Sequence, residues 1–293
     1  MTLTRKSYDM SDGSMSAVHF NVEAGPVRLV FAHANGFNAQ AYSALLTKLP
    51  VHSVAFDLRG HGFTDLPTNI ENLASFEIFA NDIVAFIDRH VNENIVLAGH
   101  SLGASCAILA SRQLQDRLVG YLGFDPVTLP SLPRYLAKSK LGRGLMKKTF
   151  PLAKNTGKRR RVFENPQQVF DRYSGRGAFM GLTDKTLNDF LVSGLRSNPN
   201  GVELSCDPLW EQAIYCAQSY DLYGAAEYLP KNSEIHYAGK HSVSTEKTRN
   251  KISRVVGEAK VIYHPEYHHM FPLQDFEFSV SRLNDCIERA SWS

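Results

Sequence analysis

Short apolar runs alternate with amphipathic stretches along the first 125 residues of the chain. Four of these runs predict buried strands, at residues 28–33, 52–57, 94–98 and 119–125. Within residues 75–90, Phe76, Phe79 and Ile83 recur at three- and four-residue steps, which predicts a helix with one apolar face. Further helices are expected over about 39–49 and directly after residue 101. Strands separated by single helices predict a parallel sheet with right-handed crossovers.

The same alternation returns near the end of the chain. Residues 234–238 and 260–263 predict two more strands, and a closing helix is expected over about 273–288. The first residues, with 14–22 as the clearest candidate, are expected to supply an antiparallel ribbon at the edge of the sheet. The pattern as a whole therefore predicts an α/β fold, with a mostly parallel central sheet and helices on both of its faces.

Between residues 127 and 229 the alternation stops. This stretch is rich in short helical patterns, prolines and charge. A segment of this length between two strands of the sheet must lie at the carboxyl ends of those strands, over any site formed there. We therefore predict a core of residues 1–126 and 230–293 and a helical lid of residues 127–229.

The composition changes this picture little. The 293 residues are 43% hydrophobic and 21% charged, as in ordinary globular proteins. No apolar run approaches the roughly 20 residues of a membrane span, and the N-terminal segment, residues 1–8, has no apolar signal core. The cysteines show no paired spacing; they are Cys106, Cys206, Cys216 and Cys286. A reduced, cytoplasmic protein without a zinc site or cofactor is expected.

The strand at 94–98 leads into Gly99-His100-Ser101-Leu102-Gly103. A Gly-x-Ser-x-Gly sequence between a buried strand and a helix is typical of a nucleophile elbow, in which a sharp turn exposes the serine Oγ. Gly99 and Gly103 are expected because any Cβ at either position would collide where strand and helix approach. The pattern alone is weak, but the small-residue helix that follows it supports the prediction. The alternative is a solvent-facing serine that caps the helix.

At this point the chain resembles the serine hydrolases of the α/β-hydrolase family. The resemblance rests on four motifs, at residues 31–37 (FAHANGF), 56–62 (FDLRGHG), 99–103 (GHSLG) and 268–273 (HHMFPL). In this family the base is a histidine on the loop before the last helix, and the resemblance assigns that role to His269. His268 stands where the family usually has glycine, and His264 is a weaker candidate. The histidines at positions 33, 61 and 100 belong to motifs that shape turns.

The orienting acid departs from the common family pattern. Residues 239–245, where many members carry an aspartate, contain no carboxylate, and Ser242 holds the expected place. Asp125, at the end of the strand after the elbow helix, is the substitute, because some members, including haloalkane dehalogenases, use an acid there. The order Ser101, Asp125, His269 is the family order. Asp125 as a turn-capping residue and Glu246 as the acid remain alternatives.

The resemblance also implies two donors for a developing oxyanion, the backbone N–H groups of Asn35 and Leu102. Dehalogenases use an Asn side chain at the first place, but they need an aspartate nucleophile where this chain has Ser101. The predicted activity is cleavage of a small-molecule carboxylic ester, with an apolar acyl chain because the lid is rich in aliphatic and aromatic residues. A C–C bond hydrolase, a lyase, a thioesterase and a non-catalytic ligand-binding scaffold are the alternatives.

Residues 134–161, the basic segment, contain eleven Lys and Arg residues and no Asp or Glu. Leucine and aromatic residues are interleaved with these charges, partly at helical spacing. Such a segment could lie on an anionic membrane surface or attract an anionic substrate. The alternative is a solvated helical face. Nucleic-acid binding is not expected, because no recognition motif accompanies the charge. The sequence leaves the oligomeric state open.

Overall fold

The computed structural model describes residues 3–257 and 260–292, so the first two residues of the N-terminal segment discussed above lie outside it. Its main feature is an eight-stranded sheet in the order β1-β2-β4-β3-β5-β6-β10-β11. The first two strands pair antiparallel and the remaining strands are parallel to one another. The strands are β1 (Leu3–Met10), β2 (Gly13–Phe20), β3 (Val27–Ala32), β4 (His52–Phe56), β5 (Ile95–His100), β6 (Leu118–Phe124), β10 (Ser233–Lys240) and β11 (Val261–His268). The predicted parallel sheet is confirmed.

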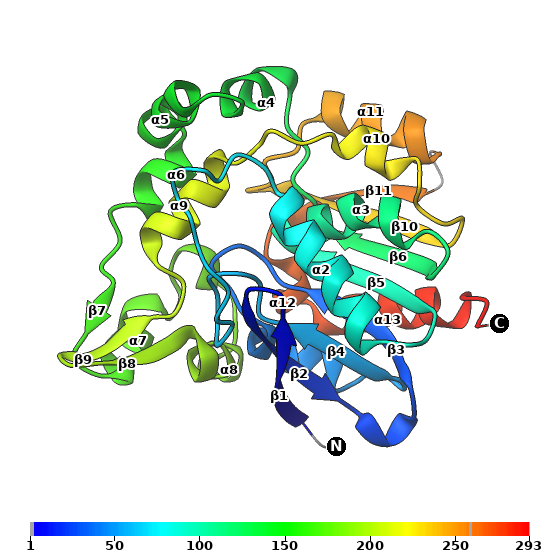
Figure 1. The fold of residues 1–293 in the computed structure, drawn as a ribbon, viewed down its shortest axis with the longest axis horizontal. Helices are drawn as coiled ribbons and strands as arrows, with labels where there is room; N and C mark the ends of the chain where they lie inside the picture. Colours follow the sequence, from blue (N-terminus) through cyan, green and yellow to red (C-terminus); the bar gives the residue numbers. More distant parts are fainter. Residues whose placement is uncertain (1–2, 258–259, 293) are drawn as a thin grey trace.

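Helices cover both faces of this sheet (Figure 1). One apolar core joins the sheet to α2 (Glu77–His90), α3 (Leu102–Leu114), α10 (Leu222–Ala226) and α11 (Glu246–Val256). The other joins it to η2 (Ala39–Tyr42), α1 (Ser43–Leu46), α12 (Phe271–Gln274) and α13 (Phe276–Glu288). A short turn of helix, η1 (Val22–Ala24), precedes β3. Strand β3 contributes side chains to both cores, because Val30 packs in the first and Phe31 in the second.

The insertion, residues 127–229, lies at one end of the sheet, on the left in Figure 1. Its helices before α10 are α4 (Ser131–Ala137), α5 (Lys140–Thr149), α6 (Pro151–Thr156), α7 (Pro166–Tyr173), η3 (Gly177–Phe179), α8 (Asp184–Gly194) and α9 (Pro208–Cys216). It also holds an antiparallel sheet that the sequence analysis did not predict, formed by β7 (Val162–Phe163), β8 (Leu195–Asn198) and β9 (Gly201–Leu204). These strands have at most four residues, too few for a clear two-residue alternation.

The last helix of the insertion, α10, packs on the core and not over the end of the sheet. Ser111 Oγ in α3 donates a hydrogen bond to Ala225 O in α10 at 3.1 Å. Arg112 donates to Asp221 O at 2.9 Å, directly before the same helix. The part of the insertion that lies beyond the sheet therefore runs from α4 to α9.

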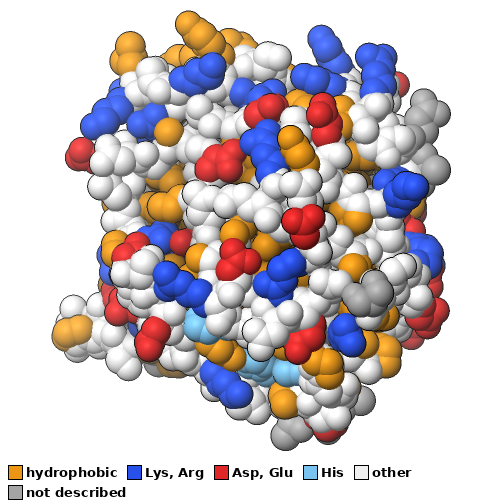
Figure 2. All heavy atoms as spheres, turned by 45° about the vertical axis from the view of Figure 1, so that its right-hand side comes forward, with side chains coloured by type: hydrophobic (Ala, Val, Ile, Leu, Met, Phe, Trp, Pro, Cys, Tyr) orange, Lys and Arg blue, Asp and Glu red, His pale blue; other side chains and the backbone are white. Residues whose placement is uncertain are grey.

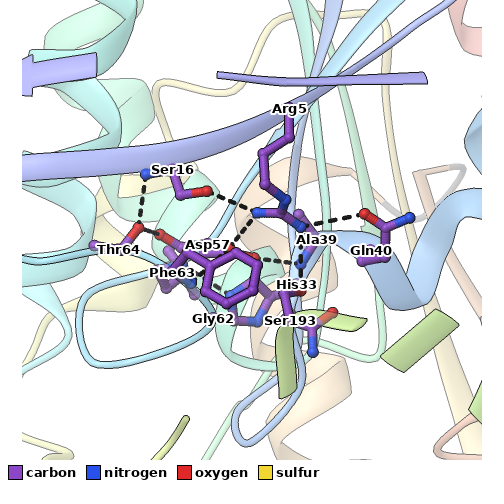
Figure 3. Close-up of polar contacts among 12 residues, drawn as sticks. Arg5, Ser16, His33, Ala39, Gln40, Asp57, Gly62, Phe63, Thr64 and Ser193 are labelled. Atoms are coloured by element: carbon purple, nitrogen blue, oxygen red, sulfur yellow. Dashed lines mark hydrogen bonds and ion pairs between the residues drawn. The ribbon is translucent and has the colours of Figure 1, made fainter. Parts of the chain in front are cut away.

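A buried carboxylate fixes the loops around the carboxyl ends of β3 and β4 (Figure 3). Asp57 accepts hydrogen bonds from the backbone N–H groups of Ala39 at 2.9 Å and Phe63 at 3.0 Å. Arg5 of β1 forms an ion pair with Asp57 at 2.6 Å and donates to Ser193 Oγ of α8 at 3.1 Å. This one guanidinium thus joins the edge ribbon, the core loops and the insertion. Removal of either charged partner would leave the other uncompensated, a change that typically costs about 3–5 kcal/mol.

Candidate active site

The chain turns sharply between β5 and α3, and Ser101 stands at the turn. Its backbone has φ 56° and ψ −114°, a conformation that side-chain-bearing residues rarely adopt. Gly103 permits the close approach, because a Cβ on it would lie 2.1 Å from Ala32 O of β3. A Cβ on Gly99 would lie 2.6 Å from the carbonyl carbon of Gly103. The expected strand–turn–helix geometry is present, and it directs Ser101 Oγ into a cavity.

His269 reaches this serine from the turn between β11 and α12. Its Nε2 lies 3.0 Å from Ser101 Oγ. The backbone of His269 is held on both sides, since its N–H donates to Lys240 O at 2.9 Å and its carbonyl accepts from His100 Nε2 at 2.8 Å. His100 is itself fixed by a 2.7 Å contact between its Nδ1 and Tyr42 Oη. The residue that precedes the serine therefore positions the loop that carries the imidazole.

Asp125, at the end of β6, contacts the other ring nitrogen of His269. Its Oδ2 lies 2.5 Å from His269 Nδ1, and its side chain is 1% exposed. Its Oδ1 accepts hydrogen bonds from Ser242 Oγ at 2.8 Å and from Ala238 N–H at 3.3 Å. The carboxylate thus faces a histidine, a hydroxyl and the backbone of β10. Glu246 is instead an exposed residue in the first turn of α11.

Ser242 was recognised in the sequence only as the occupant of the acid's usual place. In the structure its hydroxyl donates to Asp125, the carboxylate that lies one strand further along the sheet. Its Oγ also accepts a hydrogen bond from Ser244 N–H at 3.1 Å, so its hydrogen is directed at the carboxylate. The place where the resemblance expects an acid is therefore occupied by a serine that donates a hydrogen bond to Asp125.

The other histidines weighed in the sequence analysis have different surroundings. His264 Nε2 contacts His236 Nδ1 at 3.0 Å, on the strand itself. His268 stacks on His241 with ring centroids 5.1 Å apart, and both line the cavity. His33 accepts from Leu58 N–H at 2.9 Å and shapes the turn after β3. Of the candidates named from the sequence, only His269 contacts Ser101.

Burial keeps the turn-shaping histidines neutral. It lowers the pKa of His33 to about 4 and that of His61 to about 3, and it holds the pKa of His100 well below its usual range. In His33 and His61 one ring nitrogen accepts a hydrogen bond from a backbone N–H group, at Leu58 and Gly36 respectively. A protonated ring would place two donors face to face at each of these contacts.

The two backbone groups expected to hold an oxyanion lie beside Ser101. Asn35 and Leu102 both line the cavity, and Leu102 is the first residue of α3. Within the part of the chain that the structure describes, neither N–H group has a hydrogen-bond acceptor. The side chain of Asn35 is engaged elsewhere, because its Nδ2 donates to Glu211 O at 3.1 Å. The helix N-terminus adds a favourable field for negative charge at this point.

The cavity above Ser101 has a volume of about 380 Å³ and mainly apolar walls. The core contributes residues next to the elbow, and the insertion contributes the opposite wall, which includes Phe150, Leu152, Met180, Ile214 and Tyr215. Sequence reasoning had not singled out these wall residues as lining a site. They come from α6, α9 and the loops after α5 and η3, so no single period along the chain marks them.

A smaller cavity of about 180 Å³ adjoins the first and shares Asn35, Leu152 and Tyr215 with it. Its wall holds an ion pair between Arg159 and the buried Glu211. Burial raises the pKa of Glu211, while the Arg159 guanidinium beside it acts in the opposite direction. Within residues 3–257 and 260–292, no three His, Cys, Asp or Glu side chains gather so as to hold a metal ion.

A comparison with known families matches residues 29–273 to the model of the alpha/beta hydrolase family. The chain belongs to this family. Among curated proteins, this α/β hydrolase is 30% identical over 104 residues to 2-(acetamidomethylene)succinate hydrolase of Mesorhizobium japonicum, over 35% of this chain and 36% of that protein. It is 33% identical over 111 residues to protein phosphatase methylesterase 1 of Bos taurus, over 35% of this chain and 28% of that protein. The chain thus matches about a third of the length of these relatives.

Several solved structures have the same fold as this α/β hydrolase over nearly its whole length. The crystal structure of E-2-(acetamidomethylene)succinate hydrolase superposes with a TM-score of 0.79 at 18% identity, over 98% of this chain and 100% of that one. The thioesterase domain from the curacin biosynthetic pathway superposes with a TM-score of 0.78 at 13% identity, over 96% of this chain and 99% of that one. At these identities the likeness concerns the fold alone. No helix in the described residues has the length and apolar character needed to cross a bilayer.

Proposed function

We propose that this α/β hydrolase cleaves carboxylic esters with an apolar acyl chain through an acyl-enzyme. One observation carries the proposal: the contacts from Asp125 to His269 and from His269 to Ser101 end at the wall of an apolar cavity. A serine hydroxyl is a weak nucleophile until a base within hydrogen-bond reach takes its proton, and an imidazole oriented by a buried carboxylate meets that need.

In the proposed reaction Ser101 Oγ attacks the ester carbonyl carbon while its proton passes to His269 Nε2, 3.0 Å away. Asp125 stabilises the imidazolium that forms. The carbonyl oxygen, now negatively charged, accepts hydrogen bonds from the Asn35 and Leu102 N–H groups, each of which contributes about 3 kcal/mol to the barrier reduction. His269 then protonates the departing alkoxide. A water molecule, deprotonated by His269, attacks the acyl carbon, the bond to Ser101 Oγ breaks, and His269 returns the proton to Ser101 as the carboxylic acid leaves.

The walls of the cavity support an apolar acyl group. A volume of about 380 Å³ lies in the range of small-molecule sites, and residues such as Phe76, Leu129 and Met270 offer no charge to a substrate. Polar groups in the wall are few, among them Gln218 and Gln274. The names of relatives agree at the level of reaction class, since they include a hydrolase and a methylesterase.

A series of p-nitrophenyl esters of increasing acyl chain length tests the proposal. We expect turnover to rise with chain length until the cavity is filled, and Ser101→Ala to abolish it. Ser281→Ala, on the exposed surface of α13, is the matched control. A fluorophosphonate probe should label the wild-type chain and not the Ser101→Ala variant. An unlabelled wild-type chain would contradict the proposal and would favour the non-catalytic scaffold.

Product analysis on a wider panel separates the remaining alternatives. Thioesters, C–C bonded diketones and lyase substrates could all react at the same serine, because the fold hosts many chemistries. If the chain turned over acyl thioesters or diketones in preference to esters of the same acyl group, the ester assignment would be wrong while the roles of the residues would stand.

A further inference from the structure

An unusual group of large apolar side chains is exposed on α4, α5 and α6. Tyr135 is 71% and Leu141 87% exposed. The complete group, called here the apolar ridge, is Leu132, Tyr135, Leu141, Leu145 and Leu152. All five lie within 21 consecutive residues of the insertion. Single exposed hydrophobic residues need no explanation, but five on three successive helices indicate an interaction surface.

The local helix geometry explains why these side chains face outward. In α5 the buried positions are Gly142, Arg143 and Met146, whereas Leu141 and Leu145, one turn apart, lie on the exposed side. Arg143 is held inward because its guanidinium donates to Ala137 O at 2.8 Å. The helix therefore directs leucine toward solvent and arginine toward the protein, the reverse of a helix that only covers a core.

Unpaired lysines surround the apolar ridge. Within the described residues, no carboxylate lies within salt-bridge distance of four lysines of this segment, namely Lys138, Lys147, Lys148 and Lys154. Residues 131–156, which include α4, α5 and α6, contain seven Lys and Arg residues and no Asp or Glu. This part of the chain is thus positively charged. Figure 2 shows exposed hydrophobic side chains beside Lys and Arg side chains at the upper left, and Figure 1 places α4 and α5 at the upper left and α11 at the upper right.

We propose that α4, α5 and α6 bind peripherally to the surface of an anionic lipid bilayer. Leucine and tyrosine side chains flanked by lysines suit the boundary between headgroups and acyl chains, where the lysines meet anionic lipids and the apolar side chains leave water. A bilayer offers anionic headgroups to the lysines and hydrocarbon to side chains such as Leu141, with no need for a partner surface of matching shape. The charge and the apolar exposure together therefore favour a membrane.

The proposed membrane-binding surface adjoins the cavity above Ser101. Phe150 and Leu152 join α5 to α6, and both line the cavity above Ser101. Leu152 is also part of the apolar ridge. A bilayer bound at this face would adjoin the wall of the cavity, so that an apolar ester could pass from lipid to the site. This last step rests on the proposed function, whereas the binding to lipid does not.

Sedimentation with lipid vesicles tests the binding on the full chain. We expect binding to vesicles of phosphatidylcholine with phosphatidylserine, little binding to phosphatidylcholine alone, and weaker binding as salt is added. Lys138→Glu with Lys148→Glu should lower the partition coefficient at least tenfold, because each lysine near an anionic surface is worth roughly fivefold. Lys48→Glu with Lys231→Glu, exposed and outside the insertion, changes the charge equally and should have a smaller effect.

Leu132→Ser with Leu141→Ser tests insertion of the apolar ridge and should also weaken binding about tenfold. The control is Val192→Ser with Leu209→Ser, which removes two exposed apolar side chains from α8 and α9. Equal binding to both kinds of vesicle, or wild-type binding of the lysine variant, would overturn the proposal. Binding that depends on the lysines but not on the leucines would also overturn it, because the contact with the vesicles would then be purely electrostatic. Ser101→Ala should bind as the wild type does, which separates this test from that of hydrolysis.

Discussion

Replacement of Asp125 by Asn changes one oxygen into an amide and removes the buried negative charge beside His269. The substitution is nearly isosteric, and the Asn oxygen can keep the hydrogen bonds from Ser242 and Ala238. The contact with His269 Nδ1 cannot be kept in the same form, because an amide NH₂ would face a ring N–H. The ring would then favour the tautomer that carries its proton on Nε2, and Nε2 could no longer accept the proton of Ser101.

The size of the effect follows from the geometry. With His269 Nδ1 and Asp125 Oδ2 2.5 Å apart, the centres of an imidazolium and a carboxylate are about 4 Å apart, and at an effective dielectric constant of about 20 their attraction is about 4 kcal/mol. Loss of that attraction in the transition state corresponds to a roughly thousandfold fall in kcat. KM should change little, since the imidazolium exists only after proton transfer. Steady-state hydrolysis of a p-nitrophenyl ester, with thermal unfolding as the check on folding, measures both.

The neighbouring serine provides a sharper form of the same experiment. Ser242 Oγ lies 2.8 Å from Asp125 Oδ1 and occupies the place where related sequences carry the acid. The double variant Asp125→Asn with Ser242→Asp should have a kcat at least tenfold higher than Asp125→Asn alone, because it returns a carboxylate to the same side of the imidazole. A kcat of the Asp125→Asn variant within about threefold of the wild type would refute the assignment of Asp125 as the orienting acid. Glu246 would then become the next candidate for the acid that orients His269.

Three further outcomes are expected. Ser242→Ala should lower kcat about tenfold or more with little change in KM, since a hydrogen bond to a carboxylate is worth about 1.5–3 kcal/mol; an unchanged kcat would remove Ser242 from a positioning role. Gly103→Ala should destabilise the fold by about 3 kcal/mol in urea unfolding, because its Cβ would lie 2.1 Å from Ala32 O. Burial lowers the pKa of His33 to about 4 and that of His61 to about 3 from the usual 6.5, so the unfolded chain binds more protons than the folded chain in this window; each of the two should make stability fall by about 1.4 kcal/mol per pH unit as the pH drops between about 6.5 and 4. Urea midpoints that do not change with pH there would contradict the neutral state of these two histidines.

The sheet could be predicted because buried parallel strands are continuous apolar runs. Strands β3, β4 and β6 each begin and end within one residue of the predicted positions. The expected helix over 39–49 is shorter and divides into η2 and α1. The closing helix divides at Asp275, whose side chain accepts from Phe278 N–H and caps α13. Such interruptions depend on single capping contacts, which the periodicity of apolar residues does not report.

The candidate site was predictable where a local pattern required it. The glycines around Ser101 mark a sharp turn at a strand end, whereas Asp125 and His269 were predicted from the resemblance to the family; the fold brings the carboxyl ends of neighbouring strands together. The donation from Ser242 to Asp125 was not predictable, because it depends on the path of the loop after β10. The cavity wall was missed for a similar reason: Leu152 and Ile214 meet only after separate helices have packed.

The bonds of Arg5 have a consequence for how the protein is made. Arg5 leaves the ribosome before one acceptor of its guanidinium, Ser193, which follows almost two hundred residues later. Until then the arginine can bond only to Asp57 and its neighbours. Strand β1 should therefore gain its final protection from proteases late, when α8 packs against it.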